Sequence, residues 1–481
     1  MQPYQILILI AAYFGLLFLV SFFSSRAGSN AEFFRANRES PWYIVAFGMI
    51  GASLSGVTFI SLPGTVATDS FSYFQVVLGY TVGYAVIGLI LLPLYYRLNL
   101  TSIYSYLESR FGKYSYKTGA SFFLLSRIVG SSFRLFLVAN VLQLILFDEL
   151  GVPYYVTVSA TIFLIWLYTF RSGIKTVVWT DTLQTFFMLL SLGVTLIVVS
   201  DELGITAGGM INHLSESGLT KIFFFEDWKS SDHFIKQFVS GAFIAIVMTG
   251  LDQDMMQKNL TCRNLKEAQK NMFSFTIVLT VVNMMFLILG VLLTQYADLS
   301  GIDAIKDELF PAIATGGELG IGVAILFILG LIAAAYSSAD GTLTALTTSF
   351  SIDILNIEKR YEEAKQMKIR KQIHITISIL FIAVMLIFKY AIADKSVINK
   401  LFEFAGYTYG PLLGLYTLGL FTSIKVKDKL VPVVAILAPI LSYIISINSL
   451  VWFGFEFGFF ILILNGFLTL LGLILIRSKH N

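Results

Sequence analysis

The chain of 481 residues has little charge, one cysteine and four histidines. Charged residues make up only 13% of it, and no polar segment is long enough to build a separate soluble domain. Because Cys262 is the single cysteine, an internal disulfide and a metal site made of several cysteines are excluded. The histidines are scattered and form no cluster with acidic residues near one membrane face, so a membrane enzyme such as an acyl or glycosyl transferase is not expected.

What the sequence does contain is apolar segments, since 56% of its residues are hydrophobic. This composition predicts an all-α membrane protein with a single transmembrane domain over residues 1–481. The first apolar run lacks a basic start and a cleavage site, so we expect it to remain as a span. Runs of about 20 mostly apolar residues predict thirteen spans, over residues 3–23, 42–64, 73–96, 118–147, 153–170, 178–200, 236–252, 271–296, 318–350, 372–392, 399–421, 429–447 and 450–476.

The basic residues predict the orientation of these spans. With the N-terminus outside and the C-terminus in the cytoplasm, most of the 33 Lys and Arg fall in loops that face the cytoplasm, Lys258 among them. The protein is therefore expected in the plasma membrane, the inner membrane of a bacterium, with the lipid bilayer and a small solute as its partners. No nucleic acid is expected as a partner. The sequence does not predict the oligomeric state.

One apolar run contains a stretch that is unusual for a membrane helix. Residues 51–58 (GASLSGVT) place two glycines, two serines and a threonine inside the second span. Glycine weakens a helix interior, and a broken helix at membrane depth is tolerated where its backbone lines a cavity. The stretch is either a break that binds an ion and a solute, through Ser53, Ser55 and Thr58, or a site of tight helix packing.

A second polar stretch, residues 337–344 (SSADGTLT), lies inside the ninth span. Hard cations prefer oxygen ligands, and serine hydroxyls with backbone carbonyls suit Na⁺. Serine and threonine can also bond back to their own helix, but Asp340 needs a partner in the membrane. Asp340 is predicted to bind a cation, to carry a proton or to pair with an arginine.

Two arginines lie inside the fourth span. Arg127 and Arg134 are seven residues apart and share one helix face, and a guanidinium suits a carboxylate or phosphate of a solute. The alternative is an internal salt bridge, for example to Asp340 or Glu403. Asp181, at the expected start of the sixth span, is either a helix cap or an anion close to a cation site.

Taken together, these motifs resemble the sodium:solute symporter family. The resemblance covers roughly residues 30–425 and implies a LeuT-like fold of two inverted five-helix repeats, over about 42–200 and 236–421. One extra span precedes the repeats and two follow them. The residues that carry the resemblance are 54–63 (LSGVTFISLP), 178–181 (VWTD) with Gln184, 252–257 (DQDMMQ), 333–338 (AAAYSS) and 410–414 (GPLLG).

The family's sodium ligands transfer to positions in two of these motifs. The resemblance implies that the coupling ion Na⁺ is bound by the carbonyls of Gly51, Leu54 and Ala334 and the hydroxyls of Ser337 and Ser338. Asp181 occupies the family's aspartate position near that site. Carriers of the sialic acid type bind a second sodium through serines one turn further on. Here those positions are Asp340 and Gly341, so a second cation would depend on Asp340.

On the solute side, the sequence is most similar to the sodium–sialic acid symporters. Ser53, Ser55 and Thr58 match hydroxyl positions that contact the sugar acid, and Arg134 falls near the arginine that holds its carboxylate. The expected glutamine of the third span is out of register, and Gln75 is its neighbour. An acidic solute is therefore favoured, with sialic acid as one candidate.

We thus predict a sodium-coupled secondary active symporter that imports a small organic solute by alternating access, and no enzyme. Two alternatives are open at this point. A proton-coupled carrier of similar fold would use Asp340 or Asp181 as its proton site. A sodium symporter could instead carry a neutral sugar or an amino acid such as proline.

Overall fold

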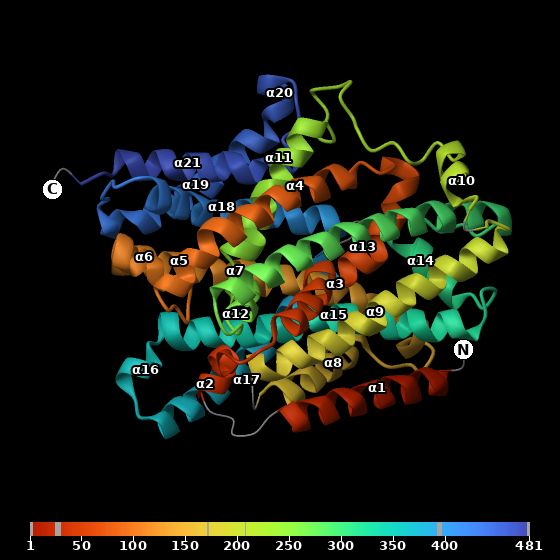
Figure 1. The fold of residues 1–481 in the computed structure, drawn as a ribbon, viewed down its shortest axis with the longest axis horizontal. Helices are drawn as coiled ribbons and strands as arrows, with labels where there is room; N and C mark the ends of the chain where they lie inside the picture. Colours follow the sequence, from red (N-terminus) through yellow and green to blue (C-terminus); the bar gives the residue numbers. More distant parts are fainter. Residues whose placement is uncertain (1–2, 25–29, 171–172, 207, 392–396, 479–481) are drawn as a thin grey trace.

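The structure is a computed structural model that describes residues 3–24, 30–170, 173–206, 208–391 and 397–478. Four basic residues of the charge pattern lie outside the described residues: Arg26, Arg171, Lys395 and Lys479. Apart from two isolated β-bridges, the regular elements of the described chain are all helices. Its long helices run side by side along one axis of the molecule, and α1 begins at one end while α21 finishes at the other (Figure 1).

Ten helices of the described chain are long and apolar enough to cross a membrane, and a bent pair makes up to eleven. The helices that form these spans are α1 (Pro3–Ser24), α3 (Trp42–Asp69), α4 (Tyr73–Val86) continuing to Arg97, α7 (Lys113–Leu142), α9 (Ile174–Glu202), α13 (Leu265–Ser300), α15 (Ile321–Ser349), α17 (Glu363–Ala391), α19 (Val431–Ile447) and α21 (Ile461–Leu475).

The predicted count of thirteen spans is therefore not confirmed, although each predicted run falls on a helix. The fifth run corresponds to α8 (Tyr154–Thr169), which has only 16 residues. The eleventh run corresponds to α18 (Val397–Phe421), which begins directly after residues that are not described.

Shorter helices connect the spans. They are α2 (Asn30–Arg35), α6 (Ser105–Arg110), α10 (Met210–Glu216), α14 (Leu309–Thr315), α16 (Ile357–Arg360) and α20 (Ser449–Phe453). Four spans also contain a π-helical turn, at Ile87–Leu91 before α5 (Leu92–Arg97), Gln143–Phe147, Ile246–Gly250 and Phe350–Ile354.

Helix α3 is broken where the sequence predicts a break. Ser55 has φ 35° and ψ 167°, which interrupts the helix between Trp42 and Asp69. A positive φ is costly for a residue other than glycine, so the surrounding packing must hold it. Gly56, the next residue, allows that packing, because a Cβ there would lie only 2.5 Å from Val138 Cγ2.

A second break separates α11 (Phe234–Ala245) and its π-helical end from α12 (Gln253–Asn259). The two parts meet at 70°, and the chain leaves helical geometry at Asp252. This lies just after Thr249 and Gly250. The seventh span therefore does not end at residue 252, because α12 continues it as a buried segment.

The two breaks lie in the centre of the helix bundle. Helices α3 and α15 are the most buried of the spans, whereas α1, α17, α19 and α21 are largely exposed at its edge. Helix α15 packs on α9, α3 and α7, and α12 inserts against α15 (Figure 1). The polar stretches of α3 and α15 consequently face each other inside the protein.

Candidate functional site

Helices α3, α9 and α15 converge around the residues that the sequence predicts as sodium ligands. Ser338 Oγ on α15 donates to the carbonyl oxygen of Ala52 on α3, at 3.4 Å. The backbone of Ala335 approaches the break as well, since a Cβ on Gly56 would lie 3.7 Å from Ala335 Cα. Such proximity brings the region around Ala334 and Ser338 to the carbonyls of the broken α3.

Helix α9 closes the same region from a third side. Ser337 Oγ donates to Asp181 Oδ1 at 2.7 Å, and the Gly51 amide donates to Thr185 Oγ1 at 3.0 Å. Asp181 is not a helix cap, because α9 begins at Ile174 and its N-cap residue is Gly173. The sodium ligands implied by the sequence are all buried here: Gly51, Leu54, Asp181, Ala334, Ser337 and Ser338.

This donor set fits a small hard cation better than a transition metal. Within the described ranges, no group of three or more His, Cys, Asp or Glu side chains could hold a metal ion. The oxygen groups around Ser337 are hydroxyls, backbone carbonyls and the Asp181 carboxylate. Oxygen ligands with little fixed charge suit Na⁺ as a transported ion.

Asp340 is held by hydroxyls and a backbone amide. Its Oδ2 accepts hydrogen bonds from Tyr168 Oη (3.0 Å) and Thr180 Oγ1 (3.3 Å), and its Oδ1 accepts from the Gly341 amide (2.6 Å). The proposed pairing of Asp340 with Arg134 is not seen in the structure, because no described carboxylate lies within 4.0 Å of Arg134.

Lys258 is a buried cation that the sequence reasoning missed. The sequence predicts Lys258 in a cytoplasmic loop, but α12 carries it into the protein, where its side chain is 1% exposed. Its Nζ lies 2.9 Å from Asp181 Oδ2 and 3.6 Å from Asp254 Oδ1. The available signal was two aspartates and a lysine at and directly after the end of the seventh predicted span, at positions 252, 254 and 258.

Arg127 is engaged in an internal ion pair, with a partner that was not foreseen. Its Nε and Nη2 donate to the two carboxylate oxygens of Asp252, both at 2.6 Å. Asp252 also caps α12 by accepting from the amides of Asp254 and Met255, and it accepts from Tyr409 Oη at 2.5 Å. Arg127 therefore holds the second helix break in place.

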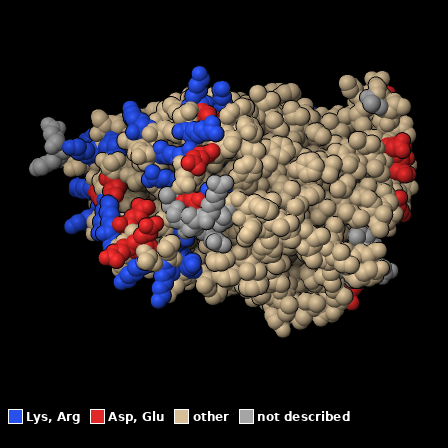
Figure 2. Space-filling model, turned by 60° about the horizontal axis from the view of Figure 1, so that its bottom comes forward, with Lys and Arg blue, Asp and Glu red and all other residues tan. Residues whose placement is uncertain are grey.

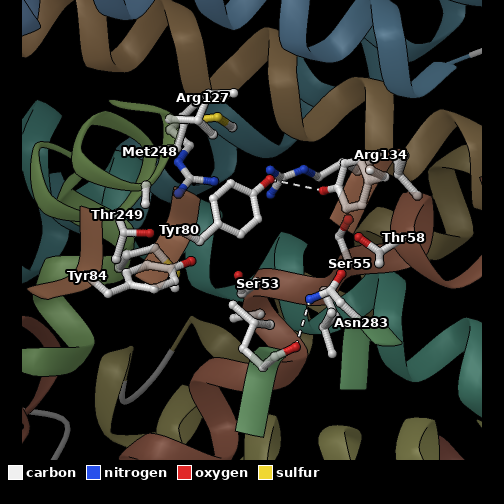
Figure 3. Close-up of a pocket in the computed structure, with 18 residues that line it drawn as sticks. Ser53, Ser55, Thr58, Tyr80, Tyr84, Arg127, Arg134, Met248, Thr249 and Asn283 are labelled. Atoms are coloured by element: carbon white, nitrogen blue, oxygen red, sulfur yellow. Dashed lines mark hydrogen bonds between the residues drawn. The ribbon is translucent and has the colours of Figure 1, made fainter. Parts of the chain in front are cut away.

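A cavity of about 70 Å³ opens between the two breaks (Figure 3). Ser53, Ser55 and Thr58 line it from the broken α3, and Arg127 and Arg134 line it from α7. The wall also includes Tyr73, an aromatic that could stack on a sugar ring, and residues that the sequence does not single out: Tyr80, Tyr84, Met248, Thr249 and Asn283. Three of these are tyrosines on one face of α4, at a spacing that could have indicated a shared wall.

Arg134 differs from the other buried cations of this region. Within the described part of the chain, its Nε has no hydrogen-bond partner and it forms no salt bridge. Its guanidinium lies beside the hydroxyl of Tyr80, which hydrogen bonds to Tyr73 Oη at 3.0 Å (Figure 3). Arg134 thus presents free donors to the cavity.

Gln75 is not among the residues that line this cavity. Its side-chain amide donates to the Asp232 carbonyl (2.8 Å) and to Gln237 Oε1 (3.3 Å), and its oxygen accepts from the Phe224 amide (3.1 Å). Gln75 therefore fixes the loop of residues 217–233 over α4. Glu403 does not pair with the arginines either, and it lines a separate cavity with Asp69.

Known proteins resemble this chain over most of its length. The model of the sodium:solute symporter family matches residues 33–426. The sodium/sialic acid symporter NanT of Aliivibrio fischeri is 26% identical over 95% of this chain and 91% of its own. The sodium/sialic acid symporter SiaT of Proteus mirabilis is also 26% identical, over 87% and 85%. The sodium-coupled monocarboxylate transporter 2 of Mus musculus is 24% identical over 82% and 63%.

Solved structures show the same fold. A sodium-coupled sialic acid symporter in a substrate-bound outward-open state aligns with a TM-score of 0.81 over 99% of both chains, at 20% identity. Mhp1, a nucleobase-cation-symport-1 transporter in a closed conformation, aligns with a TM-score of 0.56 at 15% identity, over 92% of this chain and 93% of its own. The all-helical fold with its central broken helices is thus LeuT-like, and the chain belongs to the sodium:solute symporter family, whose members carry solutes with sodium across the membrane.

Proposed function

We propose that this sodium-coupled symporter imports a small organic acid, such as sialic acid, another sugar acid or a short carboxylate. The observation that carries the proposal is Arg134, a guanidinium with free donors inside the central cavity. A guanidinium binds a carboxylate through two parallel hydrogen bonds. The hydroxyls of Ser53, Ser55 and Thr58 line the same cavity and suit the hydroxyls of a sugar.

The names of the relatives provide independent support for an acidic solute. Two are named as symporters of sialic acid and another as a transporter of monocarboxylates, and both solutes are carboxylates. The cavity of about 70 Å³ is smaller than the ~300–1,000 Å³ of typical ligand pockets. A sugar acid therefore requires the cavity to open, which suits a carrier that alternates between conformations.

The proposed sodium ligands lie on the other side of the same helix break. Carbonyls of Gly51, Leu54 and Ala334 and hydroxyls of Ser337 and Ser338 would bind the ion, with Asp181 holding Ser337 in place. Residues 51–55 would then serve both ligands, through carbonyls to sodium and hydroxyls to the solute. An ion that orders this short segment also orders the solute site, and linkage makes the effect reciprocal.

We also propose the finer architecture: thirteen spans, with inverted repeats over about 42–200 and 236–421. Its support is that α3 and the α11–α12 pair, the first helices of the two proposed repeats, are both broken. The proposed N-terminus is outside and the C-terminus inside, in the inner membrane of a bacterium. Exposed basic residues gather at the end of α6 and α16 (Figure 2), as expected of a cytoplasmic face.

Thermal stabilisation of the purified protein by candidate solutes tests the proposal. The panel is N-acetylneuraminic acid, a uronic acid, pyruvate, a neutral sugar and proline, each in NaCl and in KCl. We expect one or more acids to raise the melting temperature in NaCl only. Stabilisation by the neutral solute alone would contradict the proposed role of Arg134 in binding a carboxylate. Equal stabilisation by an acid in NaCl and in KCl would favour a proton-coupled carrier.

A further inference from the structure

The ammonium of Lys258 lies among carboxylates in the interior of the protein. Its Nζ is 2.9 Å from Asp181 Oδ2 and 3.6 Å from Asp254 Oδ1, and all three side chains are at most 3% exposed. Asp340, fully buried, is the neighbour of Gly341 on the helix that faces them. Such a group of oxygens in an apolar interior attracts a cation, and here a side chain supplies one.

Gly341 creates the space that Lys258 occupies. A Cβ at this position would lie 2.6 Å from Asp254 Oδ1, 2.7 Å from Lys258 Nζ and 3.0 Å from its Cε. Contacts shorter than 3.0 Å are not sustained by real side chains, so any larger residue would displace the ammonium. A glycine in a helix interior destabilises the helix relative to alanine. In α15 this glycine stands at the point where the Lys258 side chain approaches.

The ammonium of Lys258 is also linked to the proposed sodium site through the Asp181 carboxylate. Asp181 contacts Lys258 through Oδ2 and Ser337 through Oδ1, so one carboxylate faces both the tethered ammonium and a proposed sodium ligand. Arg127 cannot take over the role, because its guanidinium is bound to both oxygens of Asp252. Lys258 is thus the cation closest to Asp181 among the described residues.

From this geometry, we propose that Lys258 is a tethered cation that takes the place of a second sodium ion and limits the carrier to one sodium per transport cycle. The inference rests on the proposed sodium site at Gly51 and Ser338. One consequence concerns charge: a singly charged acid carried with one Na⁺ moves no net charge, so its uptake is insensitive to membrane voltage. With two sodium ions, the same uptake would be driven by the voltage.

The number of bound sodium ions can be measured without transport. A ligand that binds only the folded state stabilises it by RT ln(1 + [L]/Kd) for each site, so the slope of stability against log [Na⁺] counts the sites. The melting temperature of the purified protein is recorded from low to high NaCl, with choline chloride keeping the ionic strength constant. The variants are Lys258→Ala, which empties the position, and Lys258→Arg, which keeps a cation there.

We expect the slope of one site for the wild type and for Lys258→Arg, and a slope about twice as steep for Lys258→Ala. If Lys258→Ala does not fold even in NaCl, the double variant Lys258→Ala/Asp254→Asn restores the balance of charge, and its slope should again exceed that of the wild type. A two-site slope in the wild type overturns the proposal, as does a slope unchanged by removal of the ammonium.

The same titration separates this inference from the sodium site on which it rests. If the wild type shows no sodium dependence but Lys258→Ala gains one, the ammonium does occupy a cation position and the site at Gly51 and Ser338 is wrong. If neither protein responds to sodium, both are wrong.

Discussion

A charged side chain inside the membrane costs several kcal/mol unless a partner neutralises it. Arg127 is paired with Asp252, and Lys258 with Asp181 and Asp254. Arg134 has no such partner among the described residues, although it enters the same cavity as Arg127. At the scale of single residues, this difference indicates that Arg127 and Lys258 stabilise the fold, whereas Arg134 binds a ligand.

Arg134→Ala should therefore remove solute binding and leave the fold intact. We expect the affinity for the acidic solute to fall roughly 10- to 100-fold, the loss of a charge-assisted hydrogen-bonded contact. The melting temperature without solute should change little, because no internal partner loses its counter-charge. Binding is measured by solute-induced thermal stabilisation in NaCl.

Arg127→Ala is the matched control on the same face of α7. It leaves the Asp252 carboxylate buried and unpaired, which typically costs about 3–5 kcal/mol, so the melting temperature without solute should fall. If Arg134→Ala lowered the melting temperature as much as Arg127→Ala does, Arg134 would have a structural role and the prediction would be wrong.

Ser338→Ala tests the sodium site. The hydroxyl makes a long hydrogen bond of 3.4 Å to Ala52, so its removal should cost little stability in the absence of sodium. The sodium concentration for half-maximal stabilisation should rise roughly tenfold, because an oxygen ligand is lost. The control is Thr344→Val, six residues further along α15, where the hydroxyl has no hydrogen-bond partner in the described chain. Unchanged sodium dependence in Ser338→Ala would rule out this ligand.

At the scale of elements, α4 and α11 approach each other closely enough for their backbones to touch. A Cβ at Gly79 would collide with the Phe238 carbonyl oxygen, and a Cβ at Gly241 would collide with the Val76 carbonyl oxygen. Small residues allow such approach in membrane proteins, where van der Waals packing drives helix association. The pair therefore behaves as one rigid element that carries Tyr80 on one side and the second break at its end.

Gly79→Ala should separate this helix pair. Forcing a methyl group into the contact should lower the free energy of unfolding by about 1–3 kcal/mol, which a lower melting temperature in detergent would report. Gly193→Ala in α9 is the control, since a Cβ there meets nothing within 4 Å. Alanine in an open helix interior gains roughly 0.5–1 kcal/mol over glycine, so the control should be unchanged or more stable. A drop of the same size in both variants would contradict the close contact.

The sequence predicts the broken α3 because its glycines and serines interrupt an otherwise apolar run. It does not predict α12 as a buried segment, because Asp252, Asp254 and Lys258 are individually typical of a loop. Their burial depends on pairing with Arg127 and Asp181, which lie more than a hundred and more than seventy residues away in the chain. Hydropathy and spacing describe one segment at a time, so they identify candidate residues but not their partners. Gln75 and Lys258 are two cases in which the partner determines the role.

At the scale of the whole molecule, charge is divided between the two ends. Lys and Arg side chains gather at one end, and the opposite end carries mainly Asp and Glu on the face shown in Figure 2. Exposed members of the basic end include Lys113, Lys359, Lys365 and Lys425. Because basic loops remain in the cytoplasm, this end should face inward and the loop of residues 217–233 should face outward.

Labelling of single cysteines tests this orientation. The native Cys262 is fully buried, and a Cys262→Ser background removes it from the experiment. Glu226→Cys, on the outer loop, should react with a membrane-impermeant maleimide on intact cells, whereas Lys359→Cys, in α16, should react only after permeabilisation; both positions are exposed. The reverse labelling pattern would mean that the protein has the opposite orientation in the membrane. Sodium and solute would then enter from the end that carries α16, and uptake would still follow the inward sodium gradient, because a symporter moves both in the same direction.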